Sequence, residues 1–116
     1  MKSDTHYERE LRNILTKAGW LVIRSAGSHK WDLTALKPNE HMIIEVKATR
    51  SNKYYTTKDK EQHNQLTKYN NQGFNVYYYI RWKGDKKWER WQFPFDVKYP
   101  IFIKNEGEDY DTNNQY

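Results

Sequence analysis

Two short apolar runs in the first half of the chain, residues 31–36 (WDLTAL) and 41–49 (HMIIEVKAT), carry charged residues at inner positions. Their β-branched content, and the Pro and Asn in the turn between them, predict two strands of an antiparallel hairpin. Along the second strand, a period of two places Glu45 and Lys47 on one face and only apolar side chains on the other. Because an unpaired charge inside a core costs several kcal/mol, these positions restrict both the fold and the chemistry of the chain.

Asp32 is the acidic residue of the first run. Antiparallel pairing across the turn brings Asp32 close to a position opposite Glu45, with Leu36 near His41. Two facing carboxylates repel each other unless a cation lies between them, and carboxylates with bound water and a phosphate oxygen suit Mg²⁺. Lys47 could then hold or deprotonate a water, or stabilise the negative charge that develops in phosphodiester hydrolysis. A solvent-exposed ion pair between Glu45 and Lys47 is the alternative interpretation.

The remaining sequence predicts a small α/β domain around this hairpin. Residues 5–18 have apolar side chains at helical spacing, and residues 20–25 form an apolar, β-branched run typical of a core strand. Thr57 can cap a second helix that stops before Gly73, and the alternating pattern of residues 74–82 begins a second hairpin. The order α-β-β-β-α-β-β predicts a mixed five-stranded sheet flanked by helices.

The charge of the chain is unevenly distributed. The 116 residues have a net charge of +5, but residues 104–116 hold one Lys against four acidic residues, which leaves +8 for residues 1–103. A basic body is typical of a nucleic-acid-binding domain. The last stretch is polar and poor in aliphatic residues, so we expect a single domain over residues 1–103 and a flexible acidic tail over residues 104–116.

The absence of cysteine excludes several kinds of site. With no cysteine in the chain, disulfides, thiolate catalysis and the usual structural zinc sites are ruled out, and a cytoplasmic location is the expectation. The longest purely apolar run, residues 20–23, is far shorter than the roughly 20 residues that cross a bilayer. We expect neither a membrane partner nor a small-molecule cofactor.

Asp32, followed after twelve residues by E-V-K at positions 45–47, resembles the motif of the PD-(D/E)xK nuclease superfamily, with Trp31 in place of the proline. The wider segment 8–50 resembles the archaeal Holliday junction resolvases in its E-R-E-L helix, R-S-A-G-S turn, D-L-x-A and I-E-V-K strands and basic, Tyr-bearing loop. The resemblance implies a restriction-endonuclease-like core and a metal-dependent endonuclease. Such an enzyme makes paired nicks in four-way DNA junctions during recombination or replication, in an archaeon or in the host cytoplasm of its virus.

The resemblance also implies a set of site residues. The catalytic residues are Glu8, Asp32, Glu45 and Lys47, and the ligands of Mg²⁺, or of Mn²⁺ in its place, are Asp32, Glu45, the Val46 carbonyl and Glu8. Glu8 has a competing role, because it can form a capping box with Thr5. Glu10 flanks the same apolar stripe at a similar angle, so helix geometry leaves the two acids open. The family's acid is the first of E-R-E, which favours Glu8.

A second group of residues is expected to bind DNA. By resemblance, or because basic and aromatic side chains surround the carboxylates, it comprises Arg9, Arg24, Ser28, Lys30, Arg50, Lys53, Tyr54 and Tyr55. Basic side chains neutralise phosphates, and tyrosines can stack on the bases of an opened branch point. We expect the loop of residues 50–57 to grip the junction, and a solvated surface loop is the alternative.

A homodimer is the expected assembly, because a four-way junction has two-fold symmetry and needs two opposed cuts. The second hairpin also holds more aromatic residues than one sheet face can bury, and we expect some at a dimer interface: Tyr77, Tyr79, Trp82, Trp88, Trp91, Phe93 and Phe95. The resolvases usually have a further helix after the last strand, which this sequence does not predict. A restriction-like or mobile-element endonuclease acting on duplex or other branched DNA, and a non-catalytic DNA-structure-binding module, are therefore the alternative functions.

Overall fold

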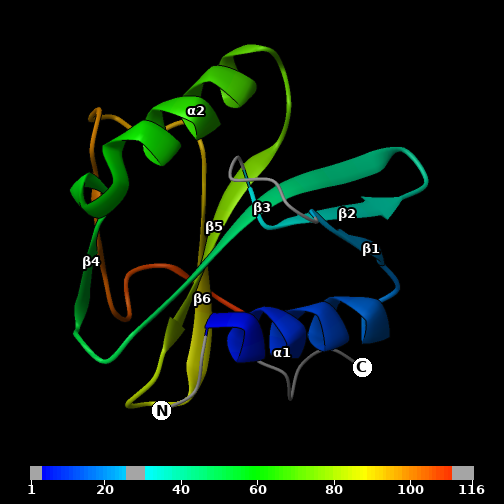
Figure 1. Ribbon diagram of the computed structural model, residues 1–116, viewed down its shortest axis with the longest axis horizontal. Coiled ribbons are helices and arrows are strands. Elements are labelled where there is room, and N and C mark those ends of the chain that lie inside the picture. The colour runs from blue at the N-terminus through cyan, green and yellow to red at the C-terminus, as the bar shows by residue number, and fades with distance from the viewer. Residues whose placement is uncertain (1–3, 26–30, 111–116) are drawn as a thin grey trace.

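The computed structural model describes residues 4–25 and 31–110 (Figure 1). In chain order its elements are α1 (Asp4–Lys17), β1 (Leu21–Arg24), β2 (Leu33–Lys37), β3 (Glu40–Thr49), β4 (Lys53–Tyr55), the 3-10 helix η1 (Thr56–Asp59), α2 (Lys60–Asn71), β5 (Val76–Trp82), β6 (Lys87–Gln92), β7 (Ile101–Ile103) and β8 (Glu108–Asp109). One six-stranded sheet has the order β1-β2-β3-β5-β6-β8, and β4 and β7 form a separate two-stranded ribbon. No helix in these two ranges is long and apolar enough to cross a membrane.

The two α-helices cover opposite faces of the large sheet (Figure 1). On one face, Leu11 of α1 is buried in a cluster that includes Ile44 of β3. On the other face, Leu66 of α2 is buried in a second cluster with Ile43. Successive side chains of β3 therefore enter opposite cores, and the period of two places Glu45 on the α2 face, beside Ile43.

β3 is a central strand that pairs antiparallel with β2 and parallel with β5. The β2–β3 register joins Leu33 to Ile44 and Leu36 to His41, as the hydrophobic pattern of the two runs predicted. The predicted mixed sheet between helices is confirmed, with six strands instead of five. The additional strand is β8, and the β4–β7 ribbon was not predicted.

β1 is an edge strand and not the core strand that its apolar run predicted. It stands at the end of the strand order, next to β2. Leu21 is 64% exposed and Ile23 is 48% exposed, although Val22 on the opposite face packs against the α1 core. Apolar composition identified the strand correctly, but it could not show that α2 leaves this end of the sheet uncovered.

The expectation of a flexible tail from residue 104 is wrong for residues 104–110. Glu108 and Asp109 form β8 on the edge of β6, and Glu108 makes an ion pair of 2.8 Å with Arg90. Tyr110 is 9% exposed and packs edge-to-face on Tyr79. One aromatic anchor and one ion pair thus order a segment whose composition alone predicts disorder. Residues 111–116 lie outside the described residues.

The aromatic residues of the second hairpin, some of which were expected at a dimer interface, are largely buried within the chain itself. Tyr79, Trp82, Trp88 and Phe93 are each at most 4% exposed, and the other members of the set, Tyr77, Trp91 and Phe95, are partly buried. The expectation counted only one buried face of the sheet. Because α1 covers one face, and α2 and the β4–β7 ribbon cover the other, both faces of β5 and β6 are cores that accommodate these rings.

Candidate active site

Asp32 and Glu45 lie side by side where β2 begins and β3 crosses the sheet. The backbone N–H of Asp32 donates to the carbonyl of Ile44 over 3.0 Å, which extends the β2–β3 ladder by one residue. The carboxylate of Asp32 then reaches over the neighbouring strand, where its Oδ2 accepts a hydrogen bond of 2.8 Å from the N–H of Val46. This bond fixes the Asp32 side chain against the backbone of β3, next to Glu45.

Glu45 is an acid in an unfavourable environment. It is 3% exposed, and burial together with repulsion by Asp32 raises its pKa to about 8, in spite of the attraction of Lys47. Its Oε1 atom is buried and has no hydrogen-bond partner among the described residues. A buried, unpartnered carboxylate oxygen costs free energy in a protein interior unless a ligand completes it.

Lys47 holds an ammonium group next to this carboxylate. Its Nζ lies 3.0 Å from Oε2 of Glu45 and 3.3 Å from Oε1 of Gln62, and the phenol of Tyr54 is close enough to interact with it. Burial lowers the pKa of Lys47, but its interactions with Glu45 first and Tyr54 second outweigh burial, so the pKa is raised overall. Lys47 therefore remains protonated at neutral pH and supplies a positive charge and N–H donors instead of accepting a proton.

Gln62 is a site residue that sequence reasoning missed. It lies in the first turn of α2, where the Asp59 carboxylate caps the helix by accepting a hydrogen bond of 3.0 Å from the Gln62 N–H. Asp59, and not the predicted Thr57, is the N-cap, because a 3-10 turn precedes the helix. The signal was available: Gln62 is four residues before the fully buried Leu66, so both occupy the helix face that packs on the sheet.

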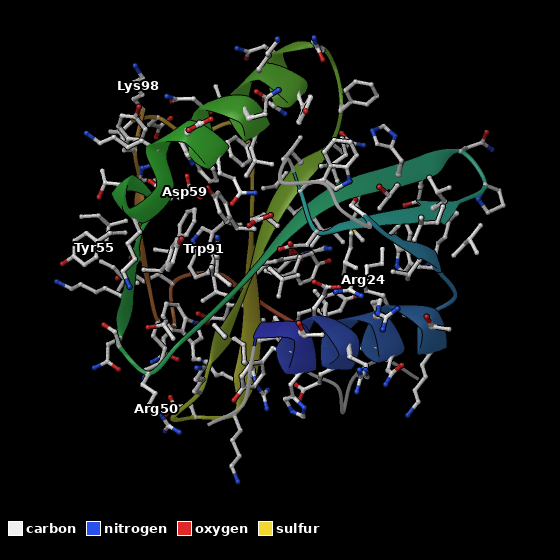
Figure 2. All side chains as sticks on the ribbon, viewed as in Figure 1. Arg24, Arg50, Tyr55, Asp59, Trp91 and Lys98 are labelled. Atoms are coloured by element: carbon white, nitrogen blue, oxygen red, sulfur yellow. The ribbon has the colours of Figure 1, made fainter. Side chains whose placement is uncertain are left out.

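The two predicted DNA-binding tyrosines, Tyr54 and Tyr55, differ in exposure: the first is buried and the second is exposed. Tyr54 is 5% exposed, pairs with Phe102 across the β4–β7 ribbon and packs 6.3 Å from Tyr78, centroid to centroid. Burial raises its pKa, so it is a neutral phenol at the back of the site and not a ring for stacking on DNA. Tyr55, the next residue, is 42% exposed, and Figure 2 shows it pointing away from the ribbon.

Glu8 and Arg24 form an ion pair on the α1 side of the sheet, at the end of β1 whose next residue, Ser25, bonds through its N–H to the Asp32 carbonyl. The Arg24 Nε is 2.6 Å from the Glu8 carboxylate, and Figure 2 shows Arg24 directly beside α1. Glu10, the competing acid, instead accepts a hydrogen bond of 2.8 Å from the Trp88 indole and lies 3.3 Å from Arg81. Glu10 thus ties α1 to β5 and β6, which leaves Glu8 as the acid on the Arg24 side.

The other predicted residues differ in how the structure places them. Arg9, Arg50 and Lys53 are exposed, and Arg50 extends into solvent just after β3 (Figure 2). Ser28 and Lys30 lie outside the described residues. Val46 contributes the N–H that holds Asp32.

The donor set fits a divalent metal ion. Two adjacent carboxylates repel each other, one of them has a buried oxygen without a partner, and a hard cation would satisfy both conditions. Within residues 4–25 and 31–110, no third His, Cys, Asp or Glu joins Asp32 and Glu45 to form a metal-binding group. Glu8 is therefore not brought to the carboxylate pair, and oxygens other than side-chain carboxylates would complete the coordination.

Comparison with known proteins agrees with this geometry. The family model for the archaeal Holliday junction resolvase (Hjc) matches residues 2–106. The crossover junction endodeoxyribonuclease Hjc of Methanocaldococcus jannaschii is 41% identical over 58 residues, which are 50% of this chain and 44% of that protein. The matched segment is thus less than half of the relative's length.

A solved structure of the Holliday junction resolvase Hjc from Archaeoglobus fulgidus has the same fold. It superimposes with a TM-score of 0.71 at 24% identity, over 88% of this chain and 84% of that one. The match with the family model extends over nearly all of the described residues and includes Asp32, Glu45 and Lys47. The chain belongs to the archaeal Holliday junction resolvase (Hjc) family.

Proposed function

We propose that the protein is a Holliday junction resolving endonuclease, which hydrolyses phosphodiester bonds and makes paired nicks in four-way DNA junctions. The observation that carries the proposal is the adjacent pair of Asp32 and the buried Glu45, beside the protonated Lys47. Attack of water on a phosphate develops negative charge, and a fixed ammonium in a poorly hydrated site stabilises that charge strongly. We place the activity in the cytoplasm of an archaeon, or of a cell infected by its virus.

Mg²⁺, with Mn²⁺ able to replace it, is the proposed cofactor. Asp32 and Glu45 would hold it, and the Val46 carbonyl is the proposed third protein ligand. When bound, such an ion polarises the scissile phosphate and lowers the pKa of a coordinated water. Because Glu8 pairs with Arg24, we propose that Glu8 orients this arginine toward the scissile strand and does not bind the ion directly.

The remaining residues of the site are proposed to position DNA. Arg24 is half-exposed beside the site, and its guanidinium can bind phosphate oxygens in bidentate fashion. Further contacts to the DNA backbone are proposed for the exposed side chains of Arg9, Arg50, Lys53 and Tyr55, and for Ser28 and Lys30. The phenol of Tyr54 is proposed to support Lys47 from behind.

Cleavage of matched substrates tests this function. We expect the protein with Mg²⁺ to nick a four-way junction in two symmetrically related strands, and to leave a duplex of the same sequence intact. A flap and a three-way junction are tested on the same gel to compare cleavage of other branched substrates. Preferential cleavage of duplex DNA would point to a restriction-like or mobile-element nuclease. If the protein bound the junction but did not nick it in Mg²⁺ or Mn²⁺, its function would be that of a non-catalytic DNA-structure-binding module.

We propose that the protein acts as a homodimer and that its interface is the β1–β2 end of the sheet, on the face that α2 covers only at β3 and beyond. Leu21 of β1 lies opposite Leu36 of β2 on the α2 face of the sheet, beyond the reach of α2. Next to them is a cavity of about 600 Å³, lined by Trp31, Thr34, Leu36, His41, Ile43, Tyr69, Gln72 and Phe74. An exposed apolar face of this kind is typical of a subunit interface. Since Trp31 precedes Asp32, a dimer through this face would bring two active sites toward one junction.

Substitution of Phe74 tests the interface. Phe74 is 44% exposed at the rim of this cavity, so Phe74→Asp should fold normally but weaken self-association by about 100-fold, because a charge would be buried in an apolar contact. Sedimentation equilibrium measures the change. The matched control is Val97→Asp, which alters a residue that is 61% exposed and does not line this cavity. A wild-type protein that is monomeric while it makes paired nicks would contradict the dimer.

A further inference from the structure

The first turn of α2 brings an uncharged side chain to the catalytic ammonium. Oε1 of Gln62 accepts a hydrogen bond of 3.3 Å from Nζ of Lys47, which lies on β3 beneath the helix. We propose that Gln62 is a positioning residue that holds the Lys47 ammonium in its working orientation. The inference rests on the proposed nuclease function, because it assigns the role of Gln62 within that same site.

The chemistry of the amide explains why glutamine suits this position. Lys47 has three N–H donors on a flexible stem, and Glu45, at 3.0 Å, together with the phenol of Tyr54 would leave one donor without an acceptor to restrain it. The additional contact to the Gln62 amide oxygen restrains the ammonium without neutralising it. The positive charge therefore remains available to a phosphate, whereas a second carboxylate would divert part of it.

The backbone that carries Gln62 is itself firmly placed. Asp59 caps the helix at the Gln62 N–H. The adjacent His63 is 1% exposed and bonds through Nδ1 to the Tyr78 hydroxyl at 2.8 Å and through Nε2 to the Lys98 carbonyl at 2.7 Å. These contacts lock the first turn of α2 to β5 and to the segment before β7, so the Gln62 side chain starts from a fixed position. A site held by such supporting contacts loses little entropy when the substrate arrives.

Two substitutions at position 62 distinguish the effect of the hydrogen-bond acceptor from the effect of side-chain size. Gln62→Met keeps the length of the side chain and removes the acceptor, and we expect the single-turnover rate of junction cleavage to fall about tenfold while the junction Kd stays within about twofold. Gln62→Glu retains an acceptor oxygen and should recover part of the lost rate but not all of it, because its charge would divert part of the positive charge of Lys47. Gln65→Met, on the same helix, is the matched control and should cleave like the wild type.

A second measurement is independent of cleavage. NMR of the ¹⁵N-labelled lysine ammonium groups, recorded without DNA or metal, should show that Lys47 loses order and exchanges its protons faster in Gln62→Met but not in Gln65→Met. Unchanged Lys47 signals in Gln62→Met would overturn the inference, as would equal rates for wild type and Gln62→Met. Equal losses in Gln62→Met and Gln62→Glu would also overturn it. If the wild type cleaves no branched DNA, the proposed function fails, and the NMR comparison still decides whether Gln62 restrains Lys47.

Discussion

Glu45→Gln and Asp32→Asn are each expected to lower the rate of junction cleavage by at least about 1000-fold while junction affinity stays within about threefold. Each substitution replaces a carboxylate by an amide of the same shape, so the fold and the basic surface are retained. What is lost is one of the two negative charges that would hold Mg²⁺. Single-turnover cleavage in Mg²⁺ and binding in Ca²⁺ or EDTA measure the two effects separately.

The helix acids provide the matched controls for this experiment. Glu10→Gln keeps an acceptor for the Trp88 indole, so it should cleave junctions at nearly the wild-type rate. Glu8→Gln weakens the pairing with Arg24 and should reduce the rate by about 10- to 100-fold. If Glu10→Gln abolished cleavage and Glu8→Gln left the cleavage rate unchanged, Glu10 and not Glu8 would be the helix acid that the reaction uses. Substantial cleavage by Glu45→Gln would remove the carboxylate pair from the mechanism.

The carboxylate pair could be predicted because it depends on local rules. In β2 and β3 the alternation of apolar residues fixes the face of each side chain, and the short turn fixes the register. Asp32 and Glu45 follow from those two facts. Lys47 follows from Glu45, since it is two residues further along the same strand.

The rest of the site depends on contacts between distant segments. Tyr54 is predicted as an exposed loop residue, yet it becomes a core residue because β7, almost 50 residues later, pairs with β4. Gln62 reaches Lys47 only because that ribbon and His63 fix α2 on the sheet. Tyr110 and Glu108 also depend on distant segments, because the contacts that order them are made by Tyr79 and Arg90 on other strands. Periodicity describes one element at a time and contains no information about which distant element will cover it.

Stability of the metal-free protein is expected to fall as the pH rises from about 5 to about 9, by up to about 5 kcal/mol through Glu45 alone. Burial and the nearby Asp32 raise the pKa of Glu45 from 4.5 to about 8 in the folded protein. Between these values the folded protein binds a proton that the unfolded chain has already lost. The resulting stabilisation is fully present below pH 4.5 and is lost as the pH rises through about 8.

Urea denaturation in EDTA between pH 5 and pH 9 measures this dependence, and Glu45→Gln should remove most of the slope because it has no proton to lose. Glu61→Gln changes an exposed acid of α2 and should keep the slope of the wild type. Added Mg²⁺ should stabilise the wild type increasingly as the pH approaches 8, since a cation bound to Glu45 must displace the proton. Equal slopes in wild type and Glu45→Gln would mean that Glu45 is not a buried acid. In that case the repulsion that makes the site attractive to a divalent ion would also be absent.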